Sequence, residues 1–160
     1  MARSAPGTNS AWDLFVKMVA TFLGTGYFPW GPGTMGSFAG ILVAWFSGPL
    51  TSAVLLIFIG LGFWACKPAV EVFQSSDPSR FVMDEACGVM IAVFLIPRTY
   101  VLYLAGFILF RFFDILKPWP ISLIQKSKDP SSIMWDDLLA GIFANTLIRG
   151  YLLYAYSGAR

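Results

Sequence analysis

The sequence predicts an all-α integral membrane protein, a compact bundle of short helices that cross the membrane or enter it part of the way. Apolar residues make up 57% of the 160 residues and charged residues 12%, and the mean hydropathy is +0.68, which is outside the range of soluble domains. This length suits one domain. We expect a disordered polar tail at residues 1–10 and a single membrane-embedded domain at residues 11–157.

The composition also excludes several functions. The net charge is only +2 and the basic residues are dispersed, so no surface for nucleic acid is expected. The chain contains no histidine, which excludes histidine acid–base catalysis, phosphohistidine intermediates and histidine-ligated zinc. Cys66 and Cys87 lie in or beside apolar runs, so buried thiols are favoured over a disulfide.

The N-terminal part of the chain, residues 11–66, divides into three segments. Residues 11–23 have the pattern of an amphipathic helix, which would lie at the membrane interface or pack on the other helices. Residues 24–37 contain five glycines and two prolines, so no regular helix is expected there, and Ser37 is expected to cap the helix that follows. The apolar runs 38–46 and 50–66, separated by Ser47-Gly48-Pro49, predict a helical hairpin.

Polar and apolar stretches alternate in the remaining chain. Residues 67–83 are polar and are expected in water, and Asp84-Glu85 then precedes the apolar runs 86–96 and 100–110. These two runs are short against the ~20 residues of a full crossing, so they predict either a shallow hairpin or a crossing that includes the flanking turns. A second polar loop at 122–132 leads to Asp136-Asp137 and the last apolar run, 138–156.

Arg111, Asp114 and Lys117 interrupt an apolar stretch at the spacing i, i+3 and i+6, which places them on one helix face. Pro118 and Pro120 should end this helix. A guanidinium, a carboxylate and an ammonium together can bind a phosphate and a divalent cation. The alternative is an anchor of long basic side chains at the membrane surface.

If the apolar hairpins cross the membrane as described, the charged motifs all meet at one face. Most of the basic residues lie there too, with Arg98 and Arg160 on the other face, so that face is predicted to be cytoplasmic. Carboxylates crowded at one interface repel each other and are costly to desolvate unless a partner is present. A divalent metal and an anionic substrate are such partners, and oxygen ligands favour Mg²⁺. The carboxylates are Asp84, Glu85, Asp114, Asp136 and Asp137.

The chemical hypothesis from these residues is hydrolysis of a phosphate ester. A metal polarises the phosphoryl group and activates water, a carboxylate takes the proton, and Arg111 with Lys117 stabilises the charge on the phosphoryl oxygens. The motifs of other phosphatases, such as Cys-x5-Arg and Asp-x-Asp-x-Thr, are absent from the sequence.

Four motifs, in order across residues 24–141, resemble the phosphatidylglycerophosphatase A family. They are Gly24-x-Gly26-x-x-Pro29-x-x-Pro32-Gly33-Thr34-x-Gly36-Ser37, Asp84-Glu85-x-x-Gly88, Phe110-Arg111-x-x-Asp114-x-x-Lys117-Pro118-Trp119-Pro120-Ile121 and Asp136-Asp137-x-x-Ala140-Gly141. The resemblance implies a multi-pass enzyme of the bacterial inner (cytoplasmic) membrane whose active site faces the cytoplasm. It would use Mg²⁺ to remove the terminal phosphate of phosphatidylglycerophosphate, giving phosphatidylglycerol in phospholipid biosynthesis.

The resemblance also assigns roles by position. The five carboxylates would be the catalytic and metal-binding set, namely Asp84, Glu85, Asp114, Asp136 and Asp137. Phosphate would be bound by Arg111, Lys117 and the glycine-rich stretch through Gly33, Thr34, Gly36 and Ser37. The remaining charged residues lie outside the motifs and are expected to be solvated or structural.

Other functions stay open beside this one. The nearest is a phosphatase for another lipid phosphate. A cation-binding membrane transporter is a second, although the charges cluster at helix ends rather than at the midplane and no inverted repeat is visible. A structural membrane protein whose acidic pairs cap helices is a third.

Overall fold

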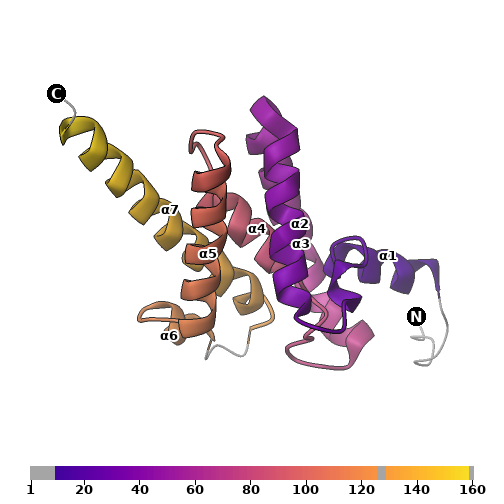
Figure 1. Cartoon of the computed structure of the whole chain (residues 1–160). Helices are drawn as coiled ribbons and strands as arrows, with labels where there is room; N and C mark the ends of the chain where they lie inside the picture. The colour runs from indigo at the N-terminus through magenta and orange to yellow at the C-terminus, as the bar shows by residue number, and fades with distance from the viewer. Residues whose placement is uncertain (1–9, 126–128, 159–160) are drawn as a thin grey trace.

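The computed structural model describes residues 10–125 and 129–158, and the regular structure within these ranges is entirely helical, as predicted. Residues 1–9 of the predicted tail, together with Lys126 and Lys128, lie outside the described residues. The elements, shown in Figure 1, are α1 (Ala11–Ala20), η1 (Thr25–Tyr27), α2 (Pro32–Ser47), η2 (Gly48–Leu50), α3 (Thr51–Phe73), α4 (Met83–Ala92), α5 (Tyr100–Leu116), α6 (Ile121–Gln125) and α7 (Ser132–Gly158).

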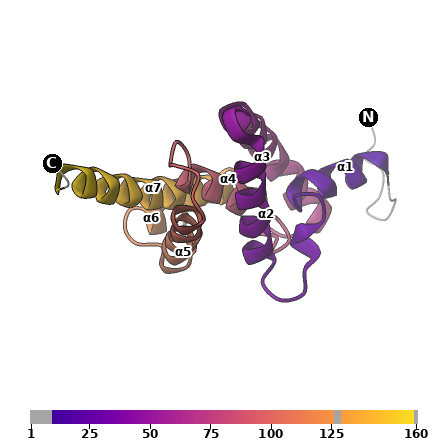
Figure 2. The same cartoon turned by 45° about the horizontal axis from the view of Figure 1, so that its top comes forward.

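The short helix α4 is the centre of the bundle. Eight of its ten residues are buried, and it packs against α2, α3, α5 and α7. Small residues allow these close contacts, since Gly40 of α2 lies against the backbone of Ala86 and Gly141 of α7 lies against the backbone of Gly88. Both views in Figures 1 and 2 place α4 between α2 and α5. Because α4 carries Asp84 and Glu85 in its first turn, this packing fixes the position of both carboxylates.

The C-terminal end of α4 lies among apolar helices and needs hydrogen-bond donors for its last carbonyl groups. The ten residues of α4 span ~15 Å, which is about half the thickness of a membrane's hydrocarbon core. Asn145 of α7 donates to the carbonyl oxygens of Ala92 and Phe94 at 3.1 and 2.9 Å, and Arg149 donates to Phe94 at 3.1 Å. Arg149 of α7 therefore has a structural role, because it holds the turn that follows α4.

The predicted hairpin is present as α2 and α3, joined by η2, but both helices extend beyond the predicted bounds. Gly31, with a left-handed φ of 78°, and Pro32 in the first turn start α2 inside the glycine-rich stretch. The prediction that residues 32–37 are not helical was wrong. The helix α3 runs through Pro68 to Phe73, so residues 67–73 are helical rather than part of a polar loop.

The N-terminal helix α1 packs on another helix, which was one of the two predicted alternatives. Val16 and Ala20 are buried, and the rings of Trp12 and Phe15 each lie 5.5 Å from that of Trp64 on α3. Trp12 and Phe15 nevertheless remain about half exposed, which leaves an apolar face uncovered. Ser10 accepts a hydrogen bond from the backbone N–H of Asp13 at 3.1 Å, so this residue caps α1 and is not part of a disordered tail.

The C-terminal half contains α5 and α7. The helix α5 ends at Leu116, directly before Lys117 and Pro118, as predicted. Figure 1 shows α7 extending away from the other helices toward the C-terminus. Two described segments, Pro32–Phe73 and Ser132–Gly158, are long and apolar enough to cross a membrane. The two cysteines are free and buried, as predicted.

Candidate active site

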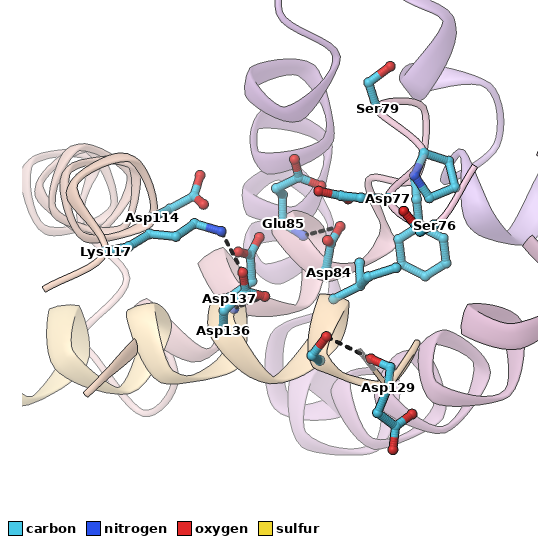
Figure 3. Close-up of a pocket in the computed structure, with 14 residues that line it drawn as sticks. Ser76, Asp77, Ser79, Asp84, Glu85, Asp114, Lys117, Asp129, Asp136 and Asp137 are labelled. Carbon is cyan, nitrogen blue, oxygen red and sulfur yellow. Dashed lines mark hydrogen bonds and ion pairs between the residues drawn. The ribbon is translucent and has the colours of Figure 1, made fainter. Parts of the chain in front are cut away.

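A cavity of about 600 Å³ opens where the first turns of α4 and α7 meet the last turn of α5 (Figure 3). The loop before α4 and residues 129–133 complete its wall. The three acidic motifs thus meet in space, although they are separated by long apolar segments in the sequence. The lining includes Lys117 and all five carboxylates of those motifs, Asp84, Glu85, Asp114, Asp136 and Asp137.

Three of these carboxylates, Asp84, Glu85 and Asp137, form a compact group that we call the acidic trio. One oxygen from each lies within 4.8 Å of the others, and the exposed fractions of Asp84 and Asp137 are only 7% and 3%. Figure 3 shows the three side chains directed into a shared space. The close approach of α4 and α7 produces this arrangement, because Gly88 of α4 packs on the backbone carbonyl of Asp137.

Two oxygens of the acidic trio are left without a partner. Glu85 Oε2 and Asp137 Oδ2 are buried and have no hydrogen-bond partner in the part of the chain that the structure describes. Burial raises the pKa of Asp84 well above its ordinary value, and the charge of Glu85 adds to this rise. Burial also raises the pKa of Glu85. Buried carboxylate oxygens without donors are costly, and a bound divalent cation would relieve that cost.

The other two carboxylates are paired with cations. Arg111 donates to Asp114 Oδ2 at 2.6 Å, and Lys117 Nζ donates to Asp136 Oδ2 at 2.5 Å. Burial lowers the pKa of Lys117, but the hydrogen bond and charge of Asp136 outweigh this effect, so the pKa is raised and the side chain stays charged. Within the described residues, the five predicted carboxylates thus divide into a trio without an ion pair and two ion-paired residues.

The position of Asp136 and Asp137 along α7 bears on the helix-capping alternative. They are the fifth and sixth residues of α7, beyond the first turn in which carboxylates complement the helix dipole. Helix capping therefore does not explain this pair. It remains compatible with Asp84 and Glu85, the second and third residues of α4.

The glycine-rich stretch meets the site through one residue. Gly33 packs so closely on the Glu85 carboxylate that a Cβ there would overlap it, and that Cβ would lie 3.3 Å from a guanidinium nitrogen of Arg111. Gly36 packs instead on Val82, and Thr34 is exposed. The prediction that Ser37 caps the following helix was wrong, because Ser37 lies inside α2 and its hydroxyl donates to the Gly33 carbonyl at 2.7 Å.

Four polar residues that line the cavity from outside the helices were not predicted as site residues. Asp77, with Ser76 and Ser79, lines the cavity from the loop before α4, and Asp129 lines it from the segment before α7. Figure 3 shows them on the side of the cavity opposite Lys117. One sequence signal points to them, because both polar segments directly precede an acidic motif and were predicted on the same membrane face.

Comparison with known proteins gives one family. The family described as phosphatidylglycerophosphatase A matches residues 18–152, which include every cavity-lining residue named above. No solved structure matches the chain significantly.

Three curated bacterial proteins illustrate the similarity. A Haemophilus influenzae protein named phosphatidylglycerophosphatase A is 38% identical over 136 residues, which cover 81% of this chain and 83% of that protein. An Escherichia coli protein of the same name is 31% identical over 150 residues, covering 90% and 85%. A Bacteroides thetaiotaomicron protein named "Putative phosphatidylinositol-3-phosphatase" is 34% identical over 143 residues, covering 82% and 89%.

Proposed function

The chain belongs to the phosphatidylglycerophosphatase A family, and we propose on this basis that it hydrolyses phosphatidylglycerophosphate to phosphatidylglycerol and phosphate. The observation that carries the proposal is the family match over residues 18–152, within which the acidic and basic motifs enclose one cavity. A cavity of about 600 Å³ with carboxylates and a lysine in its wall has room and charge for a phosphate headgroup.

The acidic trio is the proposed Mg²⁺ site. Its support is the unpartnered Glu85 Oε2 and Asp137 Oδ2, together with a donor set made only of oxygen. When bound, the ion would polarise the phosphoryl group and lower the pKa of a bound water. Asp114 and Asp136, which the sequence also placed among the metal ligands, take the role of holding the two cations in this proposal.

Arg111 and Lys117 bind the phosphoryl oxygens. Each donates one hydrogen bond to its carboxylate partner, and a guanidinium carries five N–H donors and an ammonium three. Among the described residues the remaining donors have no hydrogen-bond partner and can bind phosphate. The carboxylate partners fix the direction of both side chains. Gly33 keeps the start of α2 close to Arg111 and Glu85, where a larger residue would fill the site.

The proposed setting is a bacterial inner membrane, with several crossings and the cavity at the cytoplasmic face. Two described segments are long and apolar enough to cross, and the first of them is a hairpin. The first turn of α2, the first turn of α4 and the last turn of α5 lie together at the site. The turns at Gly48 and Arg98 lie together at the other end of the bundle. This arrangement supports a site at one membrane surface, where the lipid headgroup is found.

Phosphate release from purified protein in detergent micelles tests the proposed function. The substrates are phosphatidylglycerophosphate, phosphatidic acid and phosphatidylinositol 3-phosphate, each with Mg²⁺ and with a chelator. We expect Mg²⁺-dependent release, fastest from phosphatidylglycerophosphate. Fastest release from phosphatidylinositol 3-phosphate would move the assignment to the activity in the name of the Bacteroides relative. Absence of release from all three, in a folded protein, would contradict a phosphatase function.

Two variants make that assay specific to the site. Asp137→Asn removes a charge from the acidic trio while keeping its size, and should abolish turnover. Asp13→Asn makes the same change in the first turn of α1, away from the cavity, and should leave turnover unchanged. Equal activity of the two variants would remove Asp137 from the site.

A further inference from the structure

A second cavity, of about 420 Å³, lies between α2 and α5 on the outside of the bundle. Five of its nine lining residues belong to α2 and four to α5, and all nine are apolar or aromatic. Several remain exposed, with exposed fractions of 49% for Phe38, 41% for Leu42 and 60% for Leu104. We call this surface the apolar groove. Figures 1 and 2 show the two helices that form it on either side of α4.

The apolar groove leads to the active site along both helices. On α5, Phe107 in the groove precedes Arg111 by one turn, and on α2, Phe38 follows Thr34 by one turn. The site ends of the two helices meet where Gly33 packs on Glu85 and beside the Arg111 guanidinium. A molecule with its phosphate at Arg111 could therefore continue into the groove without leaving the protein surface.

The opposite end of the apolar groove is formed by aromatic rings. Trp45 of α2 stacks on Tyr100 of α5, with 4.7 Å between ring centroids, and meets Tyr103 edge-on at 5.1 Å. Arg98 donates to the carbonyl oxygen of Trp45 at 3.1 Å and so joins the turn before α5 to the end of α2. The groove thus runs from this aromatic group as far as Phe107, one turn short of Arg111, and α5 sets the distance from Tyr100 to Arg111.

That length matches one layer of a membrane. Arg111 lies eleven positions after Tyr100 in α5, which corresponds to a rise of about 16 Å along the helix. The hydrocarbon core of a bilayer is about 30 Å thick, so each leaflet contributes about 15 Å of acyl chain. A lipid held by its headgroup at Arg111 would direct an acyl chain along this path toward Trp45 and Tyr100.

We propose that the apolar groove binds one acyl chain of the lipid substrate while its phosphate is held at Arg111 and Lys117. The proposal rests on the proposed function and extends it from the headgroup to the chain. An acyl chain covers the exposed side chains of Phe38, Leu42 and Leu104 with matching apolar surface. The groove then selects membrane lipids over soluble phosphate esters, because an ester without a long chain gains none of this contact.

Chain-length dependence tests the groove separately from the chemistry. Leu104→Trp fills the middle of the apolar groove, about 10 Å along α5 from Arg111. A six-carbon chain extends about a third as far as a membrane-length chain, so it makes much less contact with the groove. KM and kcat are measured for phosphatidylglycerophosphate with hexadecanoyl and with hexanoyl chains. Leu56→Trp on α3 is the matched control, since Leu56 is 71% exposed and lies outside the groove.

We expect Leu104→Trp to raise KM for the hexadecanoyl substrate about tenfold, the effect of losing contact with roughly two methylene groups. KM for the hexanoyl substrate should rise much less, and kcat for both substrates should stay at its wild-type value. Leu42→Trp, on the opposite wall of the groove, should have the same effect. This second variant keeps the test valid if Leu104→Trp does not fold. Equal effects of Leu104→Trp on both substrates, or equal effects of Leu56→Trp and Leu104→Trp, would overturn the proposal.

A binding experiment keeps the two proposals distinguishable. Phosphatidylglycerol with a photoactivatable diazirine at mid-chain is crosslinked to the wild-type protein, and the labelled residues are mapped by mass spectrometry. Labelling concentrated on α2 and α5 and competed by hexadecanoyl phosphatidylglycerophosphate supports the groove, even if no substrate is hydrolysed. Labelling spread equally over α3 would show only general contact with lipid and would overturn the proposal.

Discussion

Replacing Gly88 by alanine tests whether close packing of α4 on α7 assembles the acidic trio. A Cβ at residue 88 would lie 2.7 Å from the carbonyl oxygen of Asp137 and 2.8 Å from Cζ of Phe110, whereas ordinary contacts of a Cβ begin at 3.4 Å. Relieving the contact with Asp137 requires a shift of about 0.7 Å, from 2.7 to 3.4 Å. That shift moves Asp137 away from Asp84 and Glu85.

The magnitude follows from this displacement. Misplacing catalytic groups by about 1 Å costs about 100-fold in rate, so a 0.7 Å shift should lower kcat/KM about 10- to 100-fold. Overpacking costs about 1–3 kcal/mol, and the higher helix propensity of alanine returns about 1 kcal/mol. We therefore expect a modest loss of thermal stability in detergent together with a large loss of phosphate release.

Gly150→Ala is the matched control because it makes the same substitution within α7, where a Cβ would meet no atom within 4 Å. Phosphate release and the thermal midpoint are measured for both variants and the wild type. The control should retain full activity and equal or higher stability. Full activity of Gly88→Ala, in a protein as stable as the wild type, would refute the reasoning.

Three further predictions concern the charged residues of the site and the Ser37 hydroxyl. Lys117→Met should cost about 1–3 kcal/mol of stability, because it leaves Asp136 buried without its partner, and it should raise KM. Lys117→Arg should keep part of the stability and part of the affinity for substrate. An unchanged thermal midpoint and KM in Lys117→Met would contradict this prediction. Because burial raises the pKa values of Asp84 and Glu85, both groups release their protons at a higher pH than ordinary carboxylates do. Affinity for Mg²⁺ should therefore rise with pH, and binding of Mg²⁺ should release protons. Calorimetry in two buffers would detect the released protons, and an affinity that does not change with pH would contradict the prediction. Ser37→Ala should leave kcat and KM near wild-type values, because the hydroxyl bonds within its own helix, and a large loss of activity would restore the role in phosphate binding that the sequence suggested.

The helices and the convergence of the acidic motifs were predictable from the sequence. Apolar runs separated by proline and glycine placed most helices, and Pro118 after Lys117 ended α5 where expected. Charges at the ends of successive apolar runs must return to the same membrane face when the runs form hairpins. The sequence therefore predicts that Asp84, Asp137 and their neighbours lie close together.

The helix bounds in the glycine-rich and polar stretches were not predictable by the same reasoning. Glycine and proline favour loops on average, but Gly31 and Pro32 form a helix start, in which a left-handed residue precedes a proline in the first turn. Pro68 lies inside α3 for a different reason, since packing of the flanking turns overrides the missing hydrogen bond. Local composition does not distinguish these cases.

The division of the five carboxylates also required coordinates. Sequence spacing allows Arg111 to pair with Asp114, three residues away on one helix, but does not show that Lys117 reaches Asp136 on another. Those two pairs leave the acidic trio unpaired. The apolar groove depends in the same way on contact between α2 and α5, which are separated by more than fifty residues at their closest ends.

Direct binding of a divalent cation to the acidic trio tests the central claim most closely. Mn²⁺ suits the same oxygen ligands as Mg²⁺ and is detected by electron paramagnetic resonance. We predict that the wild-type protein and Asp13→Asn bind Mn²⁺ and that Mg²⁺ competes for the site, whereas Asp137→Asn loses this binding while remaining folded. Undiminished Mn²⁺ binding by Asp137→Asn would contradict the account of this site.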